Sequence, residues 1–294
     1  MKSGFVSIVG RPNVGKSTLM NAILGEKIAI TTNKPQTTRN QIRGIYTDLD
    51  KDVQIVFLDT PGIHKAHHKL GEYMTDMAVS TFTEMDAIIF ITDDELSKGP
   101  GDKYIVDLLK NVDTPKILVI NKIDLIEPEK FQRIYHEYEE MGIFKEIYGT
   151  QANEGVNVED LLESVAGLLE EGPQYFPEDM VTDHPERFIV SEIIREKILL
   201  YTNDEVPHGT AVEIEQYEEG DRLTRISAVI YCERKSHKGI IIGKNGKKLK
   251  GIGKDAREEI EALIGQKVFL QLWVKVKENW RDSDIALTNF GYRE

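Results

Sequence analysis

The sequence predicts two domains: an α/β domain with a mostly parallel sheet covered by helices on both faces, and a smaller α+β domain. From Phe5 to about Glu171, apolar runs of strand length alternate with amphipathic helical patterns, which is typical of parallel sheets. A stretch rich in glycine and proline then interrupts the alternation, and a different pattern follows it. We therefore expect domains at 1–171 and 187–294, joined by a linker at 172–186.

The order of the elements follows from these runs. The chain opens with an apolar strand at Phe5–Val9 and a helical run that starts at Thr18. Further strands of the first domain are expected at 41–46, 53–58, 87–92, 116–120 and 146–149, with helices near 102–110, 129–141 and 157–170. In the second domain we expect a helix at 188–201, strands at 211–217 and 224–232, a helix near 246–263 and a closing strand at 267–276.

Charge is distributed unevenly along the 294 residues, whose net charge is −13. Residues 234–281 carry 13 basic against 5 acidic residues, a net charge of +8, so the remainder carries −21. This asymmetry indicates that the C-terminal part meets a polyanion. No leader or membrane-spanning run is visible, and the single cysteine, Cys232, is consistent with a reducing cytosol.

The first motif is Gly10-Arg11-Pro12-Asn13-Val14-Gly15-Lys16-Ser17, which matches G-x-x-x-x-G-K-[ST] between a strand and a helix. In such a loop, backbone N–H groups surround phosphate oxygens, a lysine reaches the β- and γ-phosphates, and a hydroxyl binds Mg²⁺. We therefore predict that Lys16 contacts phosphate and that Ser17 binds Mg²⁺. This motif alone indicates a nucleoside triphosphate site.

Two further motifs follow apolar strands. In Asp59-Thr60-Pro61-Gly62, the carboxylate can hold Mg²⁺, usually through water, and the glycine exposes a backbone N–H to the γ-phosphate. In Asn121-Lys122-Ile123-Asp124, the carboxylate of Asp124 can accept from both N1–H and the exocyclic amine of guanine. Adenine lacks this pair of donors, so the sequence predicts GTP rather than ATP.

These three motifs, in this order, resemble those of translation-factor-class GTPases. The resemblance implies that Thr38 senses Mg²⁺ and the γ-phosphate, with Thr37 as the alternative register. It also implies that Gln151 and Ala152 lie beside the guanine, where the family usually has Ser-Ala, and that the Ala152 N–H contacts guanine O6. The expected GTP contacts are Gly10, Arg11, Pro12, Asn13, Val14, Gly15, Lys16, Ser17, Thr18, Asp59, Thr60, Pro61, Gly62, Asn121, Lys122, Asp124, Gln151 and Ala152.

Catalysis is expected to differ from that of Ras-like enzymes. Ile63 follows Gly62 at the position where those enzymes have a water-orienting glutamine, and an isoleucine neither donates nor accepts a hydrogen bond. Asn13 resembles the asparagine that ligates K⁺ against the phosphates in related GTPases. We therefore expect slow, K⁺-assisted hydrolysis, with Mg²⁺ held by Ser17, Thr38 and Asp59. The catalytic residues are expected to be Lys16, Thr38, Gly62 and Asn13.

Two polar clusters receive no functional role from the sequence. His64, His67 and His68 lie in the expected second switch, but no cysteine or further histidine stands at ligand spacing nearby, so we interpret them as a solvated loop. We interpret Asp93-Asp94-Glu95 as an acidic loop.

The second domain contains a G-x-x-G motif, Gly243-Lys244-Asn245-Gly246, between an apolar run and a helix. Such a loop lets the backbone approach nucleotides closely while lysines neutralise phosphate. Between Lys235 and Arg257 there are eight basic residues and one acid, so we predict an RNA site, with a protein-binding basic helix as the alternative. The expected RNA contacts are Lys235, Lys238, Ile242, Gly243, Lys244, Asn245, Gly246, Lys247, Lys248, Lys250 and Lys254.

Four aromatic residues near the C-terminus are candidate base-stacking platforms: Trp273, Trp280, Phe290 and Tyr292. We expect Trp273 to pack in the core or under a C-terminal lid. For Trp280 the sequence leaves both roles open.

The combination of motifs is similar to that of the bacterial Era family over essentially the whole chain. Besides the GTPase and G-x-x-G motifs, the resemblance rests on Pro177-Glu178-Asp179-Met180, Arg195-Glu196-Lys197 and Leu272-Trp273-Val274-Lys275-Val276. It implies a P-loop GTPase domain followed by a type II KH domain, with GTP or GDP and Mg²⁺ as cofactors. It further implies binding to the 3′ end of 16S rRNA in 30S assembly, and a cytoplasmic protein that associates peripherally with the membrane; we expect a monomer.

The resemblance suggests a nucleotide-gated RNA clamp, in which GTP and Mg²⁺ order switches near 27–40 and 62–80. One alternative is a signalling GTPase whose basic end binds a membrane or a protein. Another is an RNA-binding module with a vestigial nucleotide fold, which is disfavoured because Lys16, Ser17, Asp59 and Asp124 are all present.

Overall fold

The computed structural model describes residues 1–34, 37–63, 68–94, 99–203 and 206–292, and it divides into two compact units. The first unit comprises Met1–Thr31, Thr38–Ala66 and Met74–Asp183, and the second comprises Thr32–Thr37, His67–Tyr73 and His184–Glu294. Within the described ranges, no helix combines the length and the apolar character needed to cross a membrane.

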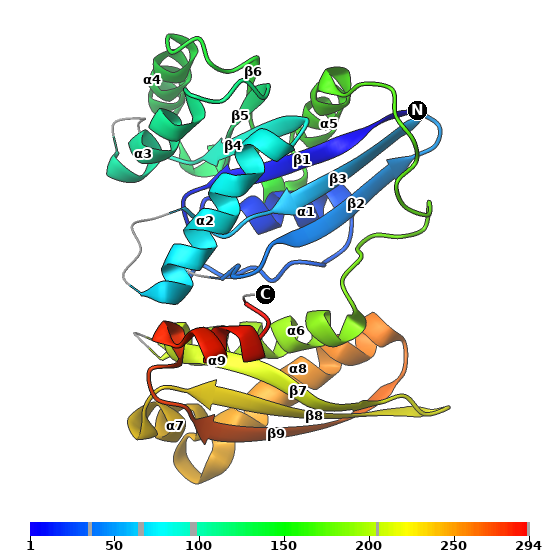
Figure 1. Ribbon diagram of the computed structural model, residues 1–294, viewed down its shortest axis with the longest axis vertical. Coiled ribbons are helices and arrows are strands. Elements are labelled where there is room, and N and C mark those ends of the chain that lie inside the picture. The colour runs from blue at the N-terminus through cyan, green and yellow to red at the C-terminus, as the bar shows by residue number, and fades with distance from the viewer. Residues whose placement is uncertain (35–36, 64–67, 95–98, 204–205, 293–294) are drawn as a thin grey trace. The chain divides into compact units, whose positions relative to one another are not determined.

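A six-stranded sheet forms the centre of the first unit, in the order β2-β3-β1-β4-β5-β6 (Figure 1). Its strands are β1 (Lys2–Gly10), β2 (Ile42–Asp48), β3 (Val53–Asp59), β4 (Ala87–Thr92), β5 (Lys116–Ile120) and β6 (Glu146–Gly149). All neighbours are parallel except β2, which pairs antiparallel with β3, so the prediction of a mostly parallel sheet is confirmed. Strands β3, β4 and β5 are buried along their full length, which explains their unbroken apolar runs.

Helices cover both faces of this sheet. On one face, α1 (Lys16–Leu24) contacts α5 (Val158–Leu168). On the other, α2 (Lys69–Glu84), α3 (Pro100–Leu109) and α4 (Pro128–Glu139) pack around a core that contains Phe90, Leu118 and Tyr138 (Figure 1). We did not expect α2 as an element, because its sequence falls in the predicted second switch.

The segment predicted as a linker follows the surface of the first unit as far as residue 183. The Gln54 side-chain oxygen accepts from the backbone N–H groups of Tyr175 and Phe176 at 2.7 and 3.0 Å, and its amide donates to the Phe176 carbonyl at 2.9 Å. Farther along, Ile45 N–H donates to the Val181 carbonyl. Residues 175–183 therefore contact β3 and the edge strand β2.

The second unit has a three-stranded sheet covered by helices. Its elements are α6 (Glu186–Tyr201), β7 (Thr210–Glu218), β8 (Leu223–Cys232), α7 (Lys235–Ile242), α8 (Lys247–Ile264), β9 (Lys267–Val276) and α9 (Asp284–Asn289). The sheet order is β7-β8-β9, with β7 antiparallel and β9 parallel to β8. The sequence pattern missed α7, which contacts α8 and β9.

The two tryptophans have opposite environments. Trp280 is completely buried, donates to the Gly209 carbonyl at 2.9 Å, and stacks against Tyr292. Trp273 is 57% exposed, so the expectation that it packs in the core is wrong. The reason is the alternation of β9: Val268 and Val274 point inward, which places Phe269 and Trp273 on the opposite face.

Candidate functional site

Four loops meet at the carboxyl ends of β1, β3, β4 and β5, the edge at which open α/β sheets bind their ligands. The loop after β1 contains Asn13 and Gly15 at positive φ, 67° and 107°. Lys16 is buried, and its ammonium donates to the carbonyls of Arg11 and Gly10 at 2.9 and 3.3 Å. Burial lowers the pKa of Lys16 to about 8, although the nearby Asp59 carboxylate opposes this shift.

A cluster of oxygen ligands lies at the start of α1. Ser17 Oγ is 2.6 Å from Asp59 Oδ2 and 2.9 Å from Thr38 Oγ1, and Thr38 Oγ1 is 3.3 Å from the same carboxylate oxygen. The Thr37 hydroxyl instead donates to the Lys34 carbonyl. The second oxygen, Asp59 Oδ1, is buried and has no hydrogen-bond partner within the described part of the chain.

Burial also acts on the carboxylate of this cluster. It raises the pKa of Asp59 to about 6, while Lys16 and the two hydroxyls act in the opposite direction. Two hydroxyls and a carboxylate are ligands of the kind that Mg²⁺ prefers, and an orphaned buried carboxylate oxygen fits a cation. The residues of this cluster therefore fit a Mg²⁺ ion.

The turn after β3 approaches the phosphate loop closely. A Cβ atom on Gly62 would lie 2.6 Å from the Pro12 nitrogen, so only glycine fits at this position. The next N–H, from Ile63, donates to the Gly10 carbonyl at 3.1 Å. The Ile63 side chain is 1% exposed and belongs to the hydrophobic core.

Asn121 joins the loop after β5 to the phosphate loop and to the loop after β6. Its side-chain amide donates to the Val14 carbonyl at 2.9 Å, and its oxygen accepts from the Thr150 hydroxyl at 3.0 Å and the Ala152 N–H at 3.1 Å. The Ala152 N–H, expected at guanine O6, therefore makes an internal contact in this structure. Gln151 is half-buried, and Asp124 is exposed in the turn after β5.

Sequence reasoning missed two carboxylates at this edge. Asp93 contacts Arg11 and Lys122, so its interpretation as part of an acidic loop is wrong. Asp102, in the first turn of α3, also contacts Arg11. Within the same cluster of three acids, Glu95 lies outside the described residues.

The histidine cluster is described only in part. His64 and His67 lie outside the described residues, and His68 Nδ1 accepts from the Gly71 N–H at 2.9 Å. In the part of the chain that the structure describes, no group of three or more His, Cys, Asp or Glu side chains is arranged to hold a metal ion.

A groove of about 470 Å³ runs between α8 and β9 in the second unit. At its end is the G-x-x-G turn, where Gly243, Asn245 and Gly246 all have positive φ. Of the expected RNA contacts, the groove brings together Gly246, Lys250 and Lys254, while Lys235 and Lys238 lie on α7. The sequence missed the other lining residues: Leu249, Gly253, Arg257, Leu270 and Leu272. The sequence does contain a signal for them: residues 246, 250, 253 and 257 have the spacing of one helix face, and residues 270 and 272 have the spacing of one strand face.

Comparison with known proteins agrees with both units. Residues 5–122 match the family model of the 50S ribosome-binding GTPases, and residues 205–281 match that of KH domains. The chain is 61% identical to GTPase Era of Alkaliphilus oremlandii, with 99% of each chain covered. It is 57% identical to GTPase Era of Clostridioides difficile, covering 100% of this chain and 99% of the relative.

Solved structures show the same similarity over 100% of both chains. An Era structure in complex with MgGDPNP and nucleotides 1506–1542 of 16S ribosomal RNA has a TM-score of 0.96 at 40% identity. A single-residue variant of Aquifex aeolicus Era bound to GDP·AlF4⁻ has a TM-score of 0.95 at 39% identity. With this fold, these motifs and relatives that align over their whole length, the chain belongs to the Era family of GTPases.

Proposed function

We propose that this GTPase binds RNA near the 3′ end of 16S rRNA and acts in assembly of the small ribosomal subunit. The observation that carries the proposal is the groove beside the G-x-x-G turn, which has an apolar floor of Leu270 and Leu272 and a wall of exposed cations. Apolar side chains accommodate bases, and Lys250, Lys254 and Arg257 can neutralise phosphates. The Era structure that contains nucleotides 1506–1542 supports this choice of RNA.

For the nucleotide, we infer that the Gly10–Ser17 loop binds the phosphates and that Asp124 selects guanine. The exposed carboxylate of Asp124 is available for two guanine donors, whereas Asn121 is engaged by the surrounding loops. Inosine lacks the exocyclic amine of guanine, so we expect IDP to bind more weakly than GDP. Equal affinities for GDP and IDP would argue against this role of Asp124.

Ser17, Asp59 and Thr38 would hold Mg²⁺, directly or through water. When bound, the ion neutralises charge on the phosphates. Lys16 is placed to transfer its hydrogen bonds from the Arg11 and Gly10 carbonyls to phosphate oxygens. Because Ile63 is buried in the core, it takes no part in orienting the attacking water.

Asn13 is exposed in the phosphate loop at a φ of 67°, which supports its role as a K⁺ ligand. K⁺ at this position would add positive charge beside the phosphates, so hydrolysis should be faster in KCl than in NaCl, and Asn13→Ala should remove the difference. Equal rates in the two salts would exclude K⁺ assistance.

The position of Thr38 supports nucleotide-dependent RNA binding. Its hydroxyl belongs to the same cluster as Ser17 and Asp59, so a nucleotide with Mg²⁺ would order the chain around it. We therefore expect different RNA affinities with a GTP analogue, with GDP and without nucleotide. The same affinity in all three states would exclude coupling.

The RNA site is tested with a 16S 3′-end fragment at fixed salt. Replacement of Lys250, Lys254 and Arg257 by glutamine should weaken binding and reduce the slope of log affinity against log salt by about 0.7 per lost contact. The matched control is Lys267→Gln, since Lys267 is 79% exposed and pairs with Glu261 outside the groove. If the triple variant binds as the control does, the groove is not the RNA site.

Crosslinking of the GTP-loaded protein to cellular RNA tests the identity of the RNA, and a peak at the 16S 3′ end is the expected result. We also propose that the protein is a cytoplasmic monomer that associates peripherally with the membrane. Binding of the protein to vesicles that contain anionic lipid tests this association. Vesicle binding without any RNA affinity would instead favour a signalling GTPase at the membrane.

A further inference from the structure

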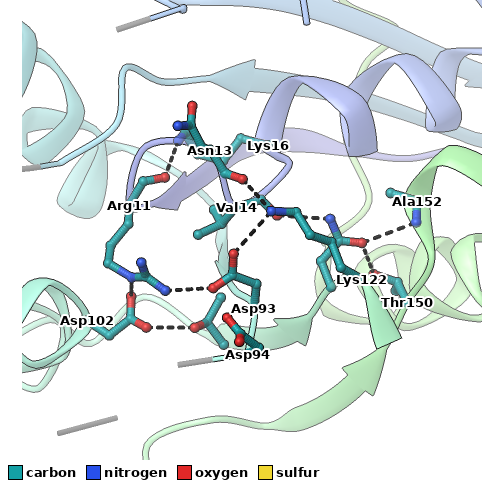
Figure 2. A network of polar contacts seen from close by, with 12 residues as sticks. Arg11, Asn13, Val14, Lys16, Asp93, Asp94, Asp102, Lys122, Thr150 and Ala152 are labelled. Atoms are coloured by element: carbon teal, nitrogen blue, oxygen red, sulfur yellow. Dashed lines mark hydrogen bonds and ion pairs between the residues drawn. The ribbon is translucent and has the colours of Figure 1, made fainter. Parts of the chain in front are cut away.

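The carboxylate of Asp93, just after β4, lies between two cations from different loops (Figure 2). Its Oδ1 accepts from an Arg11 Nη2 of the phosphate loop at 2.7 Å, and its Oδ2 accepts from Lys122 Nζ of the guanine loop at 3.1 Å. The Asp93 side chain is 17% exposed, so these contacts are shielded from bulk water. Asp93 is therefore shared between the two loops.

Arg11 is fixed from a second side. Its Nε donates to Asp102 Oδ1 at 2.7 Å, and the other oxygen of Asp102 accepts from the Thr92 hydroxyl at 2.7 Å. The Asp102 side chain is completely buried. The stem of Arg11 also packs against Gly101, where a Cβ atom would lie 2.5 Å from Arg11 Cδ. The guanidinium thus has one fixed orientation, which presents Nη2 to Asp93.

Lys122 completes the connection. Besides Asp93, its ammonium contacts the Asn13 carbonyl of the phosphate loop at 2.7 Å. Both Asn13 and Lys122 have positive φ, 67° and 59°, a conformation that non-glycine residues adopt at a cost. The contact between Lys122 and the Asn13 carbonyl holds these two residues in place, and Asp93 neutralises Lys122 together with Arg11.

We propose that Asp93 is a positioning residue that holds the phosphate loop and the guanine loop together, and thereby slows the release of bound nucleotide. The inference rests on the proposed GTP site, because a nucleotide that spans both loops leaves more slowly when the loops are tied to each other. Asp93 acts through Arg11 and Lys122, and this role does not require it to touch the ligand.

Electrostatics alone predicts the opposite sign. Removing a carboxylate near an anionic ligand should strengthen binding and slow its release. If Asp93 positions the loops, the same change should speed release, since Lys122 and Arg11 lose the group that joins them. The direction of the change in off-rate therefore separates the two explanations.

The test is the dissociation rate of fluorescent mant-GDP from the full chain, measured by stopped flow for the wild type and for Asp93→Asn. The matched control is Asp94→Asn, which removes the same charge one residue away, where the carboxylate pairs with Lys130 at 3.0 Å. We expect release about tenfold faster for Asp93→Asn, because the uncharged amide weakens both of the charge-assisted contacts, to Arg11 and to Lys122. Release from Asp94→Asn should change less than twofold.

Hydrolysis distinguishes positioning from a general loss of structure. Asp93 is not part of the cluster of Ser17, Thr38 and Asp59, so Asp93→Asn should raise KM for GTP and leave kcat within about twofold of wild type. Arg11→Lys is the second variant, because a lysine cannot contact Asp93 and Asp102 with two fixed donors. Combined with Asp93→Asn, it should add little to the effect on release.

Several results would overturn the inference. Release that is unchanged or slower in Asp93→Asn, or faster to the same extent in Asp94→Asn, would show that Asp93 does not tie the loops. A kcat that falls in parallel with the melting temperature would assign Asp93 a purely structural role. A wild-type chain that fails to bind mant-GDP would instead refute the GTP site, and the two failures are thus distinguishable.

Discussion

Substitution of Gly15 by alanine tests how tightly the phosphate loop is fitted to Asn121. A Cβ atom at Gly15 would lie 2.2 Å from Asn121 Nδ2, and the φ of 107° is itself unfavourable for an L side chain. To relieve the clash, the Asn121 side chain must move and weaken its contacts with Val14, Thr150 and Ala152. At about 1 kcal/mol for each hydrogen bond, the loss is about 3 kcal/mol in addition to backbone strain.

Gly25→Ala is the matched control for this prediction. Gly25 ends α1 at a φ of 68°, and a Cβ atom there meets nothing within 4 Å. The control should therefore lose only the cost of a left-handed alanine, about 1 kcal/mol of unfolding free energy, and keep its nucleotide affinity.

Urea unfolding and the Kd for mant-GDP measure both effects. For Gly15→Ala we expect an unfolding free energy about 4 kcal/mol lower and an affinity at least about 100-fold weaker, because two loops of the site lose their register. If Gly15→Ala bound GDP as tightly as Gly25→Ala does, the joint between Gly15 and Asn121 would have no bearing on the site.

Three further predictions concern stability and reactivity. Trp280→Ala should lower the unfolding free energy by about 3–5 kcal/mol and Trp273→Ala by less than about 1 kcal/mol, because the two side chains are 0% and 57% exposed. Urea unfolding measures both losses, and similar losses for the two variants would contradict this prediction. Gln54→Ala should cost about 2–3 kcal/mol in the same assay, because it removes a completely buried side chain that makes three hydrogen bonds to the backbone of residues 175 and 176; an effect below about 0.5 kcal/mol would refute this. Burial raises the pKa of the Cys232 thiol, so the native protein should resist DTNB at pH 8 until it unfolds, and rapid native labelling would contradict this. For the same reason, urea unfolding should show a stability that falls as the pH rises through the ordinary thiol pKa, and a stability that stays constant there would contradict the raised pKa.

The first unit was largely predictable because its central strands β3, β4 and β5 are buried on both faces. Uninterrupted apolar runs such as Ala87–Ile91 and Ile117–Ile120 have a strong signal that depends little on context. Helix α2 was missed although Leu70, Met74, Ala78 and Phe82 repeat every four residues and are all buried. The helical period was present, and the assignment of the region to a switch obscured it.

Helix α7 could not be separated from a strand by its sequence. Its second half, Gly239-Ile240-Ile241-Ile242, combines a helix-weakening glycine with three β-branched residues. The helix forms because Ile241 is buried where α7 contacts α8 and β9, and that packing depends on the tertiary fold. For β9, the alternation was readable, but the sequence did not indicate which face points inward, hence the wrong expectation for Trp273.

Prediction of the site from the sequence was limited in the same way, because some of its contacts join residues far apart in the chain. Motifs identified the phosphate loop and the guanine loop because their residues are adjacent in sequence, whereas Asp102 is 91 positions from its partner Arg11. An acid in the first turn of a helix needs no further explanation than the helix dipole, so nothing local indicated this contact. Asp93 looked like one of three loop acids for the same reason.

Two successive residues of the guanine motif hold two successive carbonyls of the phosphate loop. Asn121 donates to the Val14 carbonyl and Lys122 to the Asn13 carbonyl, at 2.9 and 2.7 Å. Loss of affinity in variants of either residue therefore combines base recognition with distortion of the phosphate loop. Asp124 differs because its side chain is exposed beyond this joint, so base preference in its variants reports recognition of guanine directly. Variants of Asp124 are therefore suited to measuring nucleotide specificity in this chain. Variants of Asn121, Lys122 and Asp93 are suited to measuring the coupling between the two loops.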